Sequence, residues 1–197
     1  MVICSIQDEG VNPLSRKPLE SIIITSAALE LLRDGGPRAV TVEAVAAQAG
    51  VAKTTIYRRY RDRSELLSDA LSSVREPAPP PGTASLKATL SWIIDQCHHA
   101  VEDGIGAGGV AALLTSQDTQ FNDQIRAMLL EHRHALTEVI RETKAAGLSR
   151  SDLDPDVALD CIVGAYLSER ARAGRVAPGW QDRVRNTMYP AFVADRL

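Results

Sequence analysis

Residues 41–60 have the sequence TVEAVAAQAGVAKTTIYRRY, in which a glycine at position 50 separates two short stretches with helical spacing of apolar residues. Thr41 is suited to cap the first helix, whose apolar face is Val42, Val45, Ala46 and Ala49. Beyond the glycine, Ile56 and Tyr60 lie four residues apart and predict a second helix over about 53–60. Two short helices joined by a glycine turn are the pattern of a helix-turn-helix, whose second helix enters the major groove of DNA.

A longer amphipathic helix precedes this pair, and a capped helix follows it. Apolar residues spaced by three and four predict the first helix from about Leu19 to Asp34, and the Gly-Gly-Pro sequence at 35–37 ends it. Residues 62–65, Asp-Arg-Ser-Glu, form a capping-box pattern, so a fourth helix is expected to start there and to continue to Val74. The first 76 residues therefore predict four helices.

The proline-rich stretch at 77–82 predicts a linker, because consecutive prolines cannot be helical. Beyond it the apolar periodicity is again helical, with Asp154 and Pro155 as the cap and first residue of one helix, and no alternating strand pattern is found. We predict an all-α protein of about nine helices, in which the fourth helix joins a helix-turn-helix domain to an antiparallel helical bundle. The predicted segments are an N-terminal extension at 1–15, the helix-turn-helix domain at 16–76, the linker at 77–82 and the bundle at 83–197.

Positive charge is concentrated at the second helix of the pair. The chain of 197 residues has a formal net charge of −3, whereas residues 53–63 contain five basic residues and one acidic residue. With its apolar residues turned inward, this helix presents Lys53, Thr54, Thr55, Tyr57, Arg58 and Arg59 to a partner. Composition alone leaves a DNA-binding surface and a solvated basic face equally open, and the glycine turn and the capping box favour the DNA-binding surface.

The chain resembles the DNA-binding domain of the tetracycline-repressor (TetR) family over about residues 17–75. The resemblance rests on residues 41–60 and on the Arg-Ser-Glu-Leu-Leu sequence at 63–67. The C-terminal half resembles, less specifically, the ligand-binding and dimerisation domain of one branch of that family, through the Asp-Leu-Asp-Pro-Asp sequence at 152–156 and the Ala-Leu-Asp sequence at 158–160.

The resemblance implies DNA contacts for eight residues of the first domain: Thr41, Lys53, Thr54, Thr55, Tyr57, Arg58, Arg59 and Arg63. Lys53 and Thr54 hold the positions that face base edges, where a lysine can donate to guanine and a threonine methyl group can touch thymine. The others hold positions of phosphate contacts, with the Tyr57 ring packed along the groove and with Arg63 in place of the lysine that typically opens the fourth helix.

Two features lie outside the family pattern. Ala52 stands where a serine or threonine cap is common, so the second helix of the pair begins without a side-chain cap worth roughly 1 kcal/mol. Ahead of the first helix, Arg16 and Lys17 belong either to a basic arm that enters the minor groove or to a frayed tail, and the sequence leaves both interpretations open.

The resemblance also implies a homodimer and a small-molecule effector bound in the bundle. In the family the effector displaces the fourth helix and changes the spacing of the two recognition helices, which must lie about 34 to 36 Å apart to engage successive major grooves. The implied dimer interface is formed by the last two helices, about 155–173 and 179–195, with apolar contacts at Ile162, Tyr166, Val184 and Met188. Candidate pocket residues, for which core packing is the more common role, are Trp92, Gln96, His98, Phe121, Met128, His132 and Tyr166.

Other motif matches in the sequence lack the context that their functions need. The G-x-G-x-x-G sequence at 104–109 follows a helical segment instead of a buried strand, so we expect an inter-helix loop there. Asp152, Asp154 and Asp156 imitate the start of a calcium loop, but Val157 and Val163 stand where glycine and glutamate are required. The histidines diverge on their helices and the three cysteines are widely spaced, so we expect no metal, no disulfide and no cofactor.

The start of the chain lacks the basic and apolar regions of a signal peptide, and no apolar stretch approaches the roughly 18 to 20 residues of a membrane span. We therefore expect a cytoplasmic protein without a membrane partner. The leading hypothesis is a dimeric repressor that binds a palindromic DNA operator and is released by a small molecule. Two alternatives stay open, a ligand-binding module without DNA binding and a small helical enzyme, although no nucleophile elbow or pair of catalytic carboxylates is found.

Overall fold

The structure is a computed structural model that describes residues 19–72, 74, 80, 85–116 and 118–193. Its helices in chain order are α1 (Leu19–Gly35), the 3-10 helix η2 (Pro37–Ala39), α2 (Val42–Ala49), α3 (Lys53–Arg59), α4 (Arg63–Ser72), α5 (Leu86–His99), the π-helix η3 (Ala100–Ile105), α6 (Gly106–Thr115), α7 (Thr119–Ala145), α8 (Pro155–Ala173) and α9 (Trp180–Phe192). Within the described residues, one isolated bridge between Ser149 and Val193 is the only β-type pairing. The predicted all-α fold is confirmed.

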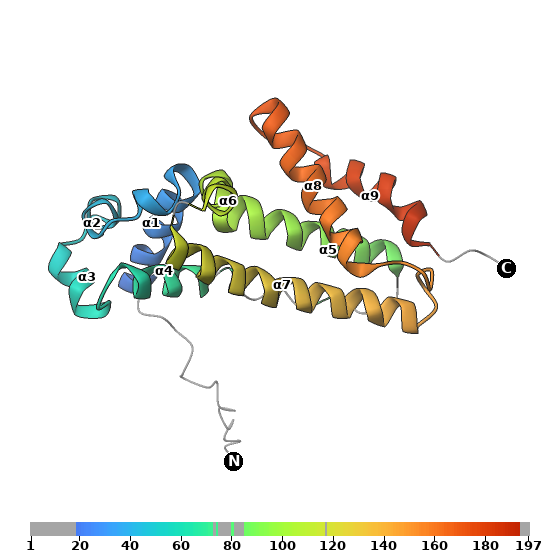
Figure 1. The fold of residues 1–197 in the computed structure, drawn as a ribbon, viewed down its shortest axis with the longest axis horizontal. Helices are drawn as coiled ribbons and strands as arrows, with labels where there is room; N and C mark the ends of the chain where they lie inside the picture. The colour runs from blue at the N-terminus through green and yellow to red at the C-terminus, as the bar shows by residue number, and fades with distance from the viewer. Residues whose placement is uncertain (1–18, 73, 75–79, 81–84, 117, 194–197) are drawn as a thin grey trace, which may run out of the picture.

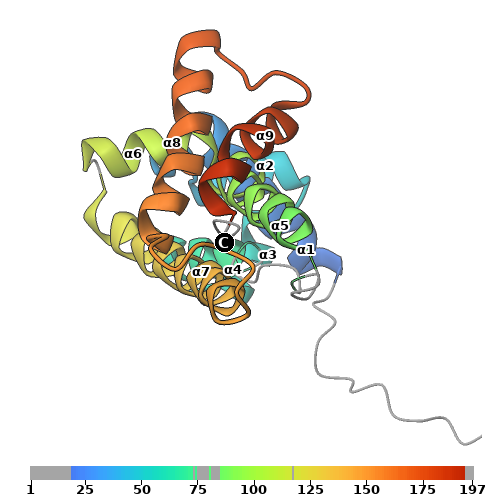
Figure 2. The same cartoon turned by 90° about the vertical axis from the view of Figure 1, so that its right-hand side faces the viewer.

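The molecule is elongated, with the helix-turn-helix pair at one end (Figure 1). Helices α2 and α3 form the tip of that end, and α1 and α4 lie directly behind them. Helices α5 and α7 run along the long axis, and α8 and α9 cover the far half of α5, as the end view in Figure 2 also shows. The pair is therefore exposed at a tip, where nothing in the described part of the chain covers α3.

Side-chain caps begin several of the helices, three of them at residues that the sequence predicts. The Thr41 hydroxyl accepts a hydrogen bond from the Ala44 amide at 3.1 Å, and α3 begins at Ala52 without a side-chain cap. The Asp154 carboxylate accepts hydrogen bonds from two backbone amides at the start of α8. These three predictions are confirmed, because a cap depends only on residues within one helical turn.

The capping box of α4 differs from the prediction in one contact. The Asp62 carboxylate accepts a hydrogen bond from the Glu65 amide at 2.9 Å, as expected. The Glu65 carboxylate, however, reaches back to the amide of Arg61 at 2.7 Å instead of the amide of Asp62. The extra reach brings the Arg61 guanidinium within 3.2 Å of the same carboxylate, and these hydrogen bonds lower the pKa of Glu65.

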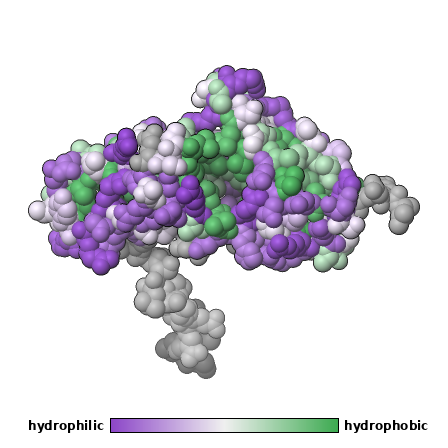
Figure 3. All heavy atoms as spheres, viewed as in Figure 1, coloured by the Kyte–Doolittle hydropathy of each residue, from purple (hydrophilic) through white to green (hydrophobic). Residues whose placement is uncertain are grey.

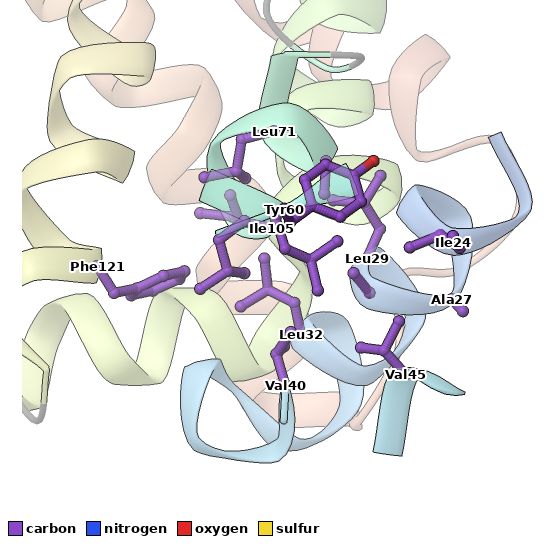
Figure 4. Close-up of a cluster of buried hydrophobic side chains, with 14 of the residues drawn as sticks. Ile24, Ala27, Leu29, Leu32, Val40, Val45, Tyr60, Leu71, Ile105 and Phe121 are labelled. Carbon is purple, nitrogen blue, oxygen red and sulfur yellow. The ribbon is translucent and has the colours of Figure 1, made fainter. Parts of the chain in front are cut away.

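The hydrophobic core of the helix-turn-helix domain continues into the bundle (Figure 4). Ile24, Leu32 and Val45 from α1 and α2 are fully buried. Ile105 and Phe121, which follow the predicted linker, pack into the same cluster and are 2% and 1% exposed. The two domains are therefore joined by shared apolar side chains, so a shift on one side of this core displaces the other.

The G-x-G-x-x-G sequence is helical, so the prediction of an inter-helix loop at 104–109 is wrong. Helix α5 passes without a break into the π-helix η3, and Gly106 turns the chain into α6 with a φ of +63°. Only glycine adopts this backbone conformation readily, so the turn needs no additional loop residues. The remaining glycines of the motif are buried or half-buried against neighbouring helices, except for Gly109, which lies over Ile105 of its own segment.

Several sequence predictions lie outside the described residues: the extension at 1–15, the arm residues Arg16 and Lys17, and all of the linker at 77–82 except Pro80. In the part of the chain that the structure describes, no helix is long and apolar enough to cross a membrane. The same part holds no cluster of three or more histidine, cysteine or acidic side chains arranged for a metal ion.

Candidate DNA-binding surface and bundle cavity

Helix α3 turns its apolar residues inward and its polar residues outward. Ile56 and Tyr60 are 1% and 6% exposed, whereas the ring of Tyr57 between them is 57% exposed. The exposed residues of the helix are Lys53, Thr54, Tyr57 and Arg58, and the half-buried ones are Thr55 and Arg59. The cationic and hydroxyl groups at the tip of the molecule suit a polyanion, and the exposed aromatic ring among them suits flat bases.

The turn between α2 and α3 fixes the direction of α3. Gly50 ends α2 in the left-handed conformation, with a φ of +66°. The Val51 amide then donates to the Ala46 carbonyl at 3.0 Å, which closes the end of α2. A residue with a Cβ atom would be strained at position 50, so glycine is needed for this turn.

The phenol of Tyr60 anchors the end of α3 to the helices behind it. Its hydroxyl lies 3.1 Å from the Ser21 hydroxyl of α1 and donates to the Asp69 carboxylate of α4 at 2.7 Å. Burial raises the pKa of Tyr60, so the phenol stays protonated and keeps its donor. Helix α3 is thereby attached to both α1 and α4.

Lys53 forms an ion pair within the chain on the exposed face of α3. Its ammonium group lies 2.8 Å from the carboxylate of Glu43 on α2, and this hydrogen bond lowers the pKa of Glu43. Both side chains are more than half exposed. Such an exposed pair contributes little to stability, so a DNA base or phosphate can replace Glu43 at small cost.

The two arginines at the end of α3 share one carboxylate of α1. Arg59 lies 2.7 Å from the Glu20 carboxylate and Arg58 lies 3.6 Å from it, and the Arg59 hydrogen bond is the main cause of the lowered pKa of Glu20. The Arg58 side chain is 71% exposed and that of Arg59 is 26% exposed. Arg58 is therefore the more available for a phosphate, while Arg59 ties α3 to the first turn of α1.

Arg63 is engaged inside the protein. Its guanidinium donates to the Val40 carbonyl at 2.7 Å, to the Pro37 carbonyl, and to the Asp118 carboxylate at 3.0 Å. Asp118 in turn caps α7 by accepting a hydrogen bond from the Phe121 amide. Arg63 thus links the start of α4, the connection between α1 and α2, and the start of α7. These contacts give the Arg63 guanidinium a structural role, and its phosphate contact stays a prediction.

Arg63→Ala is expected to lower the free energy of unfolding by roughly 2 kcal/mol, because charge-assisted hydrogen bonds and two part-buried carbonyl acceptors are lost. Arg61→Ala is the matched control, since the Arg61 side chain is 87% exposed and its loss should cost less than about 0.5 kcal/mol. Urea unfolding of the two variants and the parent measures both values. Equal stability of the two variants would show that the Arg63 contacts contribute nothing.

A cavity of about 460 Å³ lies in the bundle between η3, α6, α7 and α8. Figure 3 shows apolar side chains gathered in a hollow on this face, between the helix-turn-helix end and the far end of the bundle. Leu114 and Leu130 of the lining are 79% and 65% exposed, so the cavity opens to solvent through an apolar mouth. The cavity is lined by Cys97, Ala100, Val101, Ile105, Val110, Leu113, Leu114, Arg126, Leu129, Leu130, His132, Arg133, Leu136, Leu159, Asp160, Val163 and Leu167.

Of the seven candidate pocket residues, His132 lines this cavity and the other six do not. Phe121 and Met128 belong to the core shared with the helix-turn-helix domain, and Gln96 is buried on α5. Tyr166 lies in the second core cluster, against which the half-buried Trp92 packs. The His98 ring lies 5.5 Å from the ring of Tyr166 and 5.7 Å from that of Trp180.

Two leucine pairs that the sequence prediction missed line the cavity: Leu113-Leu114 and Leu129-Leu130. Adjacent residues on a helix point about 100° apart, and in each pair the first leucine packs against the core while the second is exposed. An apolar residue beside the core-facing stripe of its helix was the available signal for a second apolar surface.

Charged residues surround part of the cavity. Arg133 lies 2.8 Å from the Asp156 carboxylate and 2.7 Å from the Asp160 carboxylate, which joins α7 to the start of α8. Arg126 is more loosely paired, at 3.7 Å from Asp123. Burial raises the pKa of the Cys97 thiol to about 12, so this lining residue remains a neutral thiol and is not a nucleophile.

The outer surface of α8 and α9 combines small and half-exposed apolar residues with the charged side chains of Glu169, Arg172 and Arg183. Val184 and Met188 of the predicted interface line a groove between the two helices, together with Ala165 and Thr187. Ile162 and Tyr166 are 0% and 1% exposed, so within one chain they belong to the core and are not open to a second copy. The residues of α8 that do face outward include Cys161, Gly164 and Ser168.

Comparisons with known proteins agree with this architecture. Residues 24–70 match the family model described as bacterial regulatory proteins of the tetR family. An HTH-type transcriptional regulator of Mycobacterium tuberculosis is 31% identical over 141 residues, which cover 70% of this chain and 68% of the relative.

Solved structures share the fold. A TetR-family transcriptional regulator from Agrobacterium tumefaciens superposes with a TM-score of 0.64 at 19% identity, covering 89% of this chain and 98% of that one. The transcriptional regulator FadR from Bacillus subtilis, solved in complex with stearoyl-CoA, superposes with a TM-score of 0.58 at 18% identity, covering 85% and 96%. With a helix-turn-helix at its tip and a helical bundle behind it, the chain belongs to the tetR family of bacterial regulatory proteins, which are DNA-binding transcriptional regulators and not enzymes.

Proposed function

We propose that the protein is a cytoplasmic repressor that binds a palindromic operator as a homodimer and is released by an effector with a long apolar chain. The observation that carries the proposal is the exposed face of α3, where Lys53, Thr54, Tyr57 and Arg58 stand at the tip of the molecule with the apolar residues of the helix buried. A helix with this exposure fits the major groove, and its cations neutralise phosphates on either side.

A palindromic operator has two equivalent half-sites, so a second copy of the chain is needed to bind it. The groove between α8 and α9 and the small residues beside it form a surface on which α8 of a second copy can pack closely. Small residues allow helix backbones to approach one another, which is favourable for an interface between like helices. The proposed contacts are Val184 and Met188 in the groove and Cys161, Gly164 and Ala165 on α8.

The cavity supports an effector of mainly apolar character. Its volume of about 460 Å³ lies within the range of about 300 to 1,000 Å³ that is typical of ligand pockets. Leucine and valine side chains form most of the wall, while Arg126 at the rim is a loosely paired cation for an anionic end. The similarity to FadR, which was solved with stearoyl-CoA, makes a long acyl chain the first class to test.

Stearoyl-CoA is expected to reduce operator affinity of the wild-type protein by about 5- to 150-fold, the usual range of allosteric coupling. Val163→Trp places an indole in the cavity, so the variant should lose both stearoyl-CoA binding and the operator response. Val157→Trp on the same helix is the matched control, because Val157 is 56% exposed and does not line the cavity. Fluorescence anisotropy of a labelled operator gives the affinity, and calorimetry gives the binding of stearoyl-CoA.

If stearoyl-CoA and free stearate leave the operator affinity of the wild type unchanged, the acyl class is wrong. If Val157→Trp and Val163→Trp respond alike, the effector does not occupy this cavity.

A further inference from the structure

Three glycines of the 104–109 motif lie at the contact between the bundle and the helix-turn-helix domain. A Cβ atom at Gly108 would lie 2.4 Å from the Gly36 nitrogen and 2.5 Å from the Leu32 carbonyl oxygen, both in the backbone at the end of α1. A Cβ atom at Gly106 would lie 2.5 Å from the Cα of Arg33, and one at Gly104 would lie 2.6 Å from Cγ1 of Val74. These distances are too short for a side chain at any of the three positions, and at Gly108 the backbone of α6 lies directly against the backbone at the end of α1.

The same segment forms a wall of the cavity. Ile105 lies between two of these glycines and lines the cavity, while its side chain also reaches the core of the helix-turn-helix domain (Figure 4). Val110 and Leu113, on the next turns of α6, line the cavity as well. Any occupant that displaces this wall must therefore move the backbone that touches α1.

Helix α1 connects that contact to the recognition helix. It is 17 residues long, or roughly 25 Å at the rise of an α-helix. Its C-terminal end meets Gly106 and Gly108, and near its N-terminal end Ser21 and Glu20 hold α3 through Tyr60 and Arg59. A rigid helix held at both ends transmits a displacement along its length, so α3 follows the position of α6.

We infer that residues 104–108 form a glycine joint between α6 and α1. When a ligand fills the cavity and displaces α6, the joint moves α1, and α1 moves α3. Gly108 is the positioning residue of this joint. The inference rests on the proposed function, since it describes how the cavity and the DNA surface are coupled. It assigns the transmission to the backbone contact between α6 and α1, in addition to the displacement of the fourth helix that the family resemblance implies. Glycine is required at position 108 because the contact there is backbone against backbone, so no flexible side chain at that point absorbs the movement.

Gly108→Ala tests the joint with the cavity empty. Gly108 is helical without a positive φ, so alanine suits its backbone, and only the clash with α1 has to be relieved. The variant is expected to bind an operator enriched from random DNA at least tenfold more weakly than the wild type. Ala107→Ser is the matched control, because Ala107 is exposed in the same turn and should leave operator affinity unchanged.

The decisive readout is the affinity of the cavity for 1-anilinonaphthalene-8-sulfonate, an apolar fluorescent anion. Coupling between two sites is reciprocal, so a variant shifted toward the released state binds a cavity probe that favours this state more tightly as it binds the operator more weakly. A variant that is merely damaged exposes core surface and binds the probe there, and this binding persists when Val163→Trp is added, whereas binding in the cavity is lost. We expect at least a fivefold tighter probe affinity in Gly108→Ala, and unchanged or weaker binding overturns the inference. Val163→Trp shows which part of the fluorescence comes from the cavity.

A second pair of variants tests the joint if Gly108→Ala does not fold. Gly104→Ala presses on Cγ1 of Val74, which follows α4, and adding Val74→Ala removes that atom. We expect Gly104→Ala to weaken operator binding, and the double variant to restore it to within about twofold of Val74→Ala alone. No restoration, with both proteins folded by circular dichroism, contradicts a role of close packing at the joint.

The two proposals fail in different ways. If the wild type binds no operator, the proposed function fails, while tighter probe binding in Gly108→Ala together with faster hydrogen exchange of the amides at 29–36 still supports the joint. If the wild type binds its operator and Gly108→Ala binds both operator and probe as the wild type does, the joint fails and the proposed function stands.

Discussion

Tyr57→Ala is expected to lower operator affinity on the order of 100-fold while leaving the fold and the dimer intact. The ring is 57% exposed and has no role in the core, so its removal should change the free energy of unfolding by less than about 0.5 kcal/mol. A groove contact of this kind is worth about 1 to 3 kcal/mol per half-site, and a dimer loses two of them. Each 1.4 kcal/mol corresponds to a tenfold change in affinity.

Tyr57→Phe is the control for this prediction. It keeps the ring and removes the hydroxyl, so it separates packing along the groove from a phosphate hydrogen bond. Operator binding by anisotropy at two salt concentrations, with sedimentation to confirm the dimer, measures the effect. Wild-type affinity in Tyr57→Ala would show that the ring does not contact the groove, and a monomeric or unfolded variant would show that the ring supports the fold or the dimer.

Gly164→Glu is expected to convert the dimer into a folded monomer. A Cβ atom at Gly164 meets no atom within 4 Å, so the chain itself has room for a side chain there. If α8 packs against α8 of a second copy, the variant brings two carboxylates together in a desolvated contact, which costs several kcal/mol. A monomer engages one half-site instead of two, so operator affinity should fall by more than 100-fold.

Ala145→Glu is the matched control, because it adds the same charge at an exposed position at the end of α7. Sedimentation velocity gives the oligomeric state, and crosslinking of the exposed Cys161 by a bismaleimide reports on the same face in the wild type. A dimeric Gly164→Glu protein with wild-type operator affinity would place the interface elsewhere.

Features that depend on neighbouring residues were predicted from the sequence. The cap at Thr41, the glycine turn between α2 and α3 and the uncapped start of α3 are each determined within one helical turn. The burial of Ile56 and Tyr60 also followed from their spacing. These features position the candidate DNA surface, so the sequence predicted the orientation of α3 well.

Features that depend on how helices pack could not be predicted in the same way. Phe121 and Tyr166 have the spacing of inward-facing residues, but which cavity or core an inward face meets depends on helix offsets. The role of Arg63 is set by two carbonyls more than twenty residues away and by Asp118, which no periodicity brings together. The glycines at 104–109 indicated a loop locally, whereas the contacts of Gly106 and Gly108 with the end of α1 and of Gly104 with Val74 account for them in the structure.

The most direct test of the central claim is selection of bound sequences from a random DNA pool, with the number of protein chains measured on the enriched site. We expect an enriched palindrome that holds an even number of chains, with affinity that falls steeply as salt rises. We also expect that Tyr57→Ala does not retain this palindrome. The selection is run with the protein as purified and after extraction of any bound stearoyl-CoA. If the folded protein enriches no sequence in either form, DNA binding through α2 and α3 is contradicted.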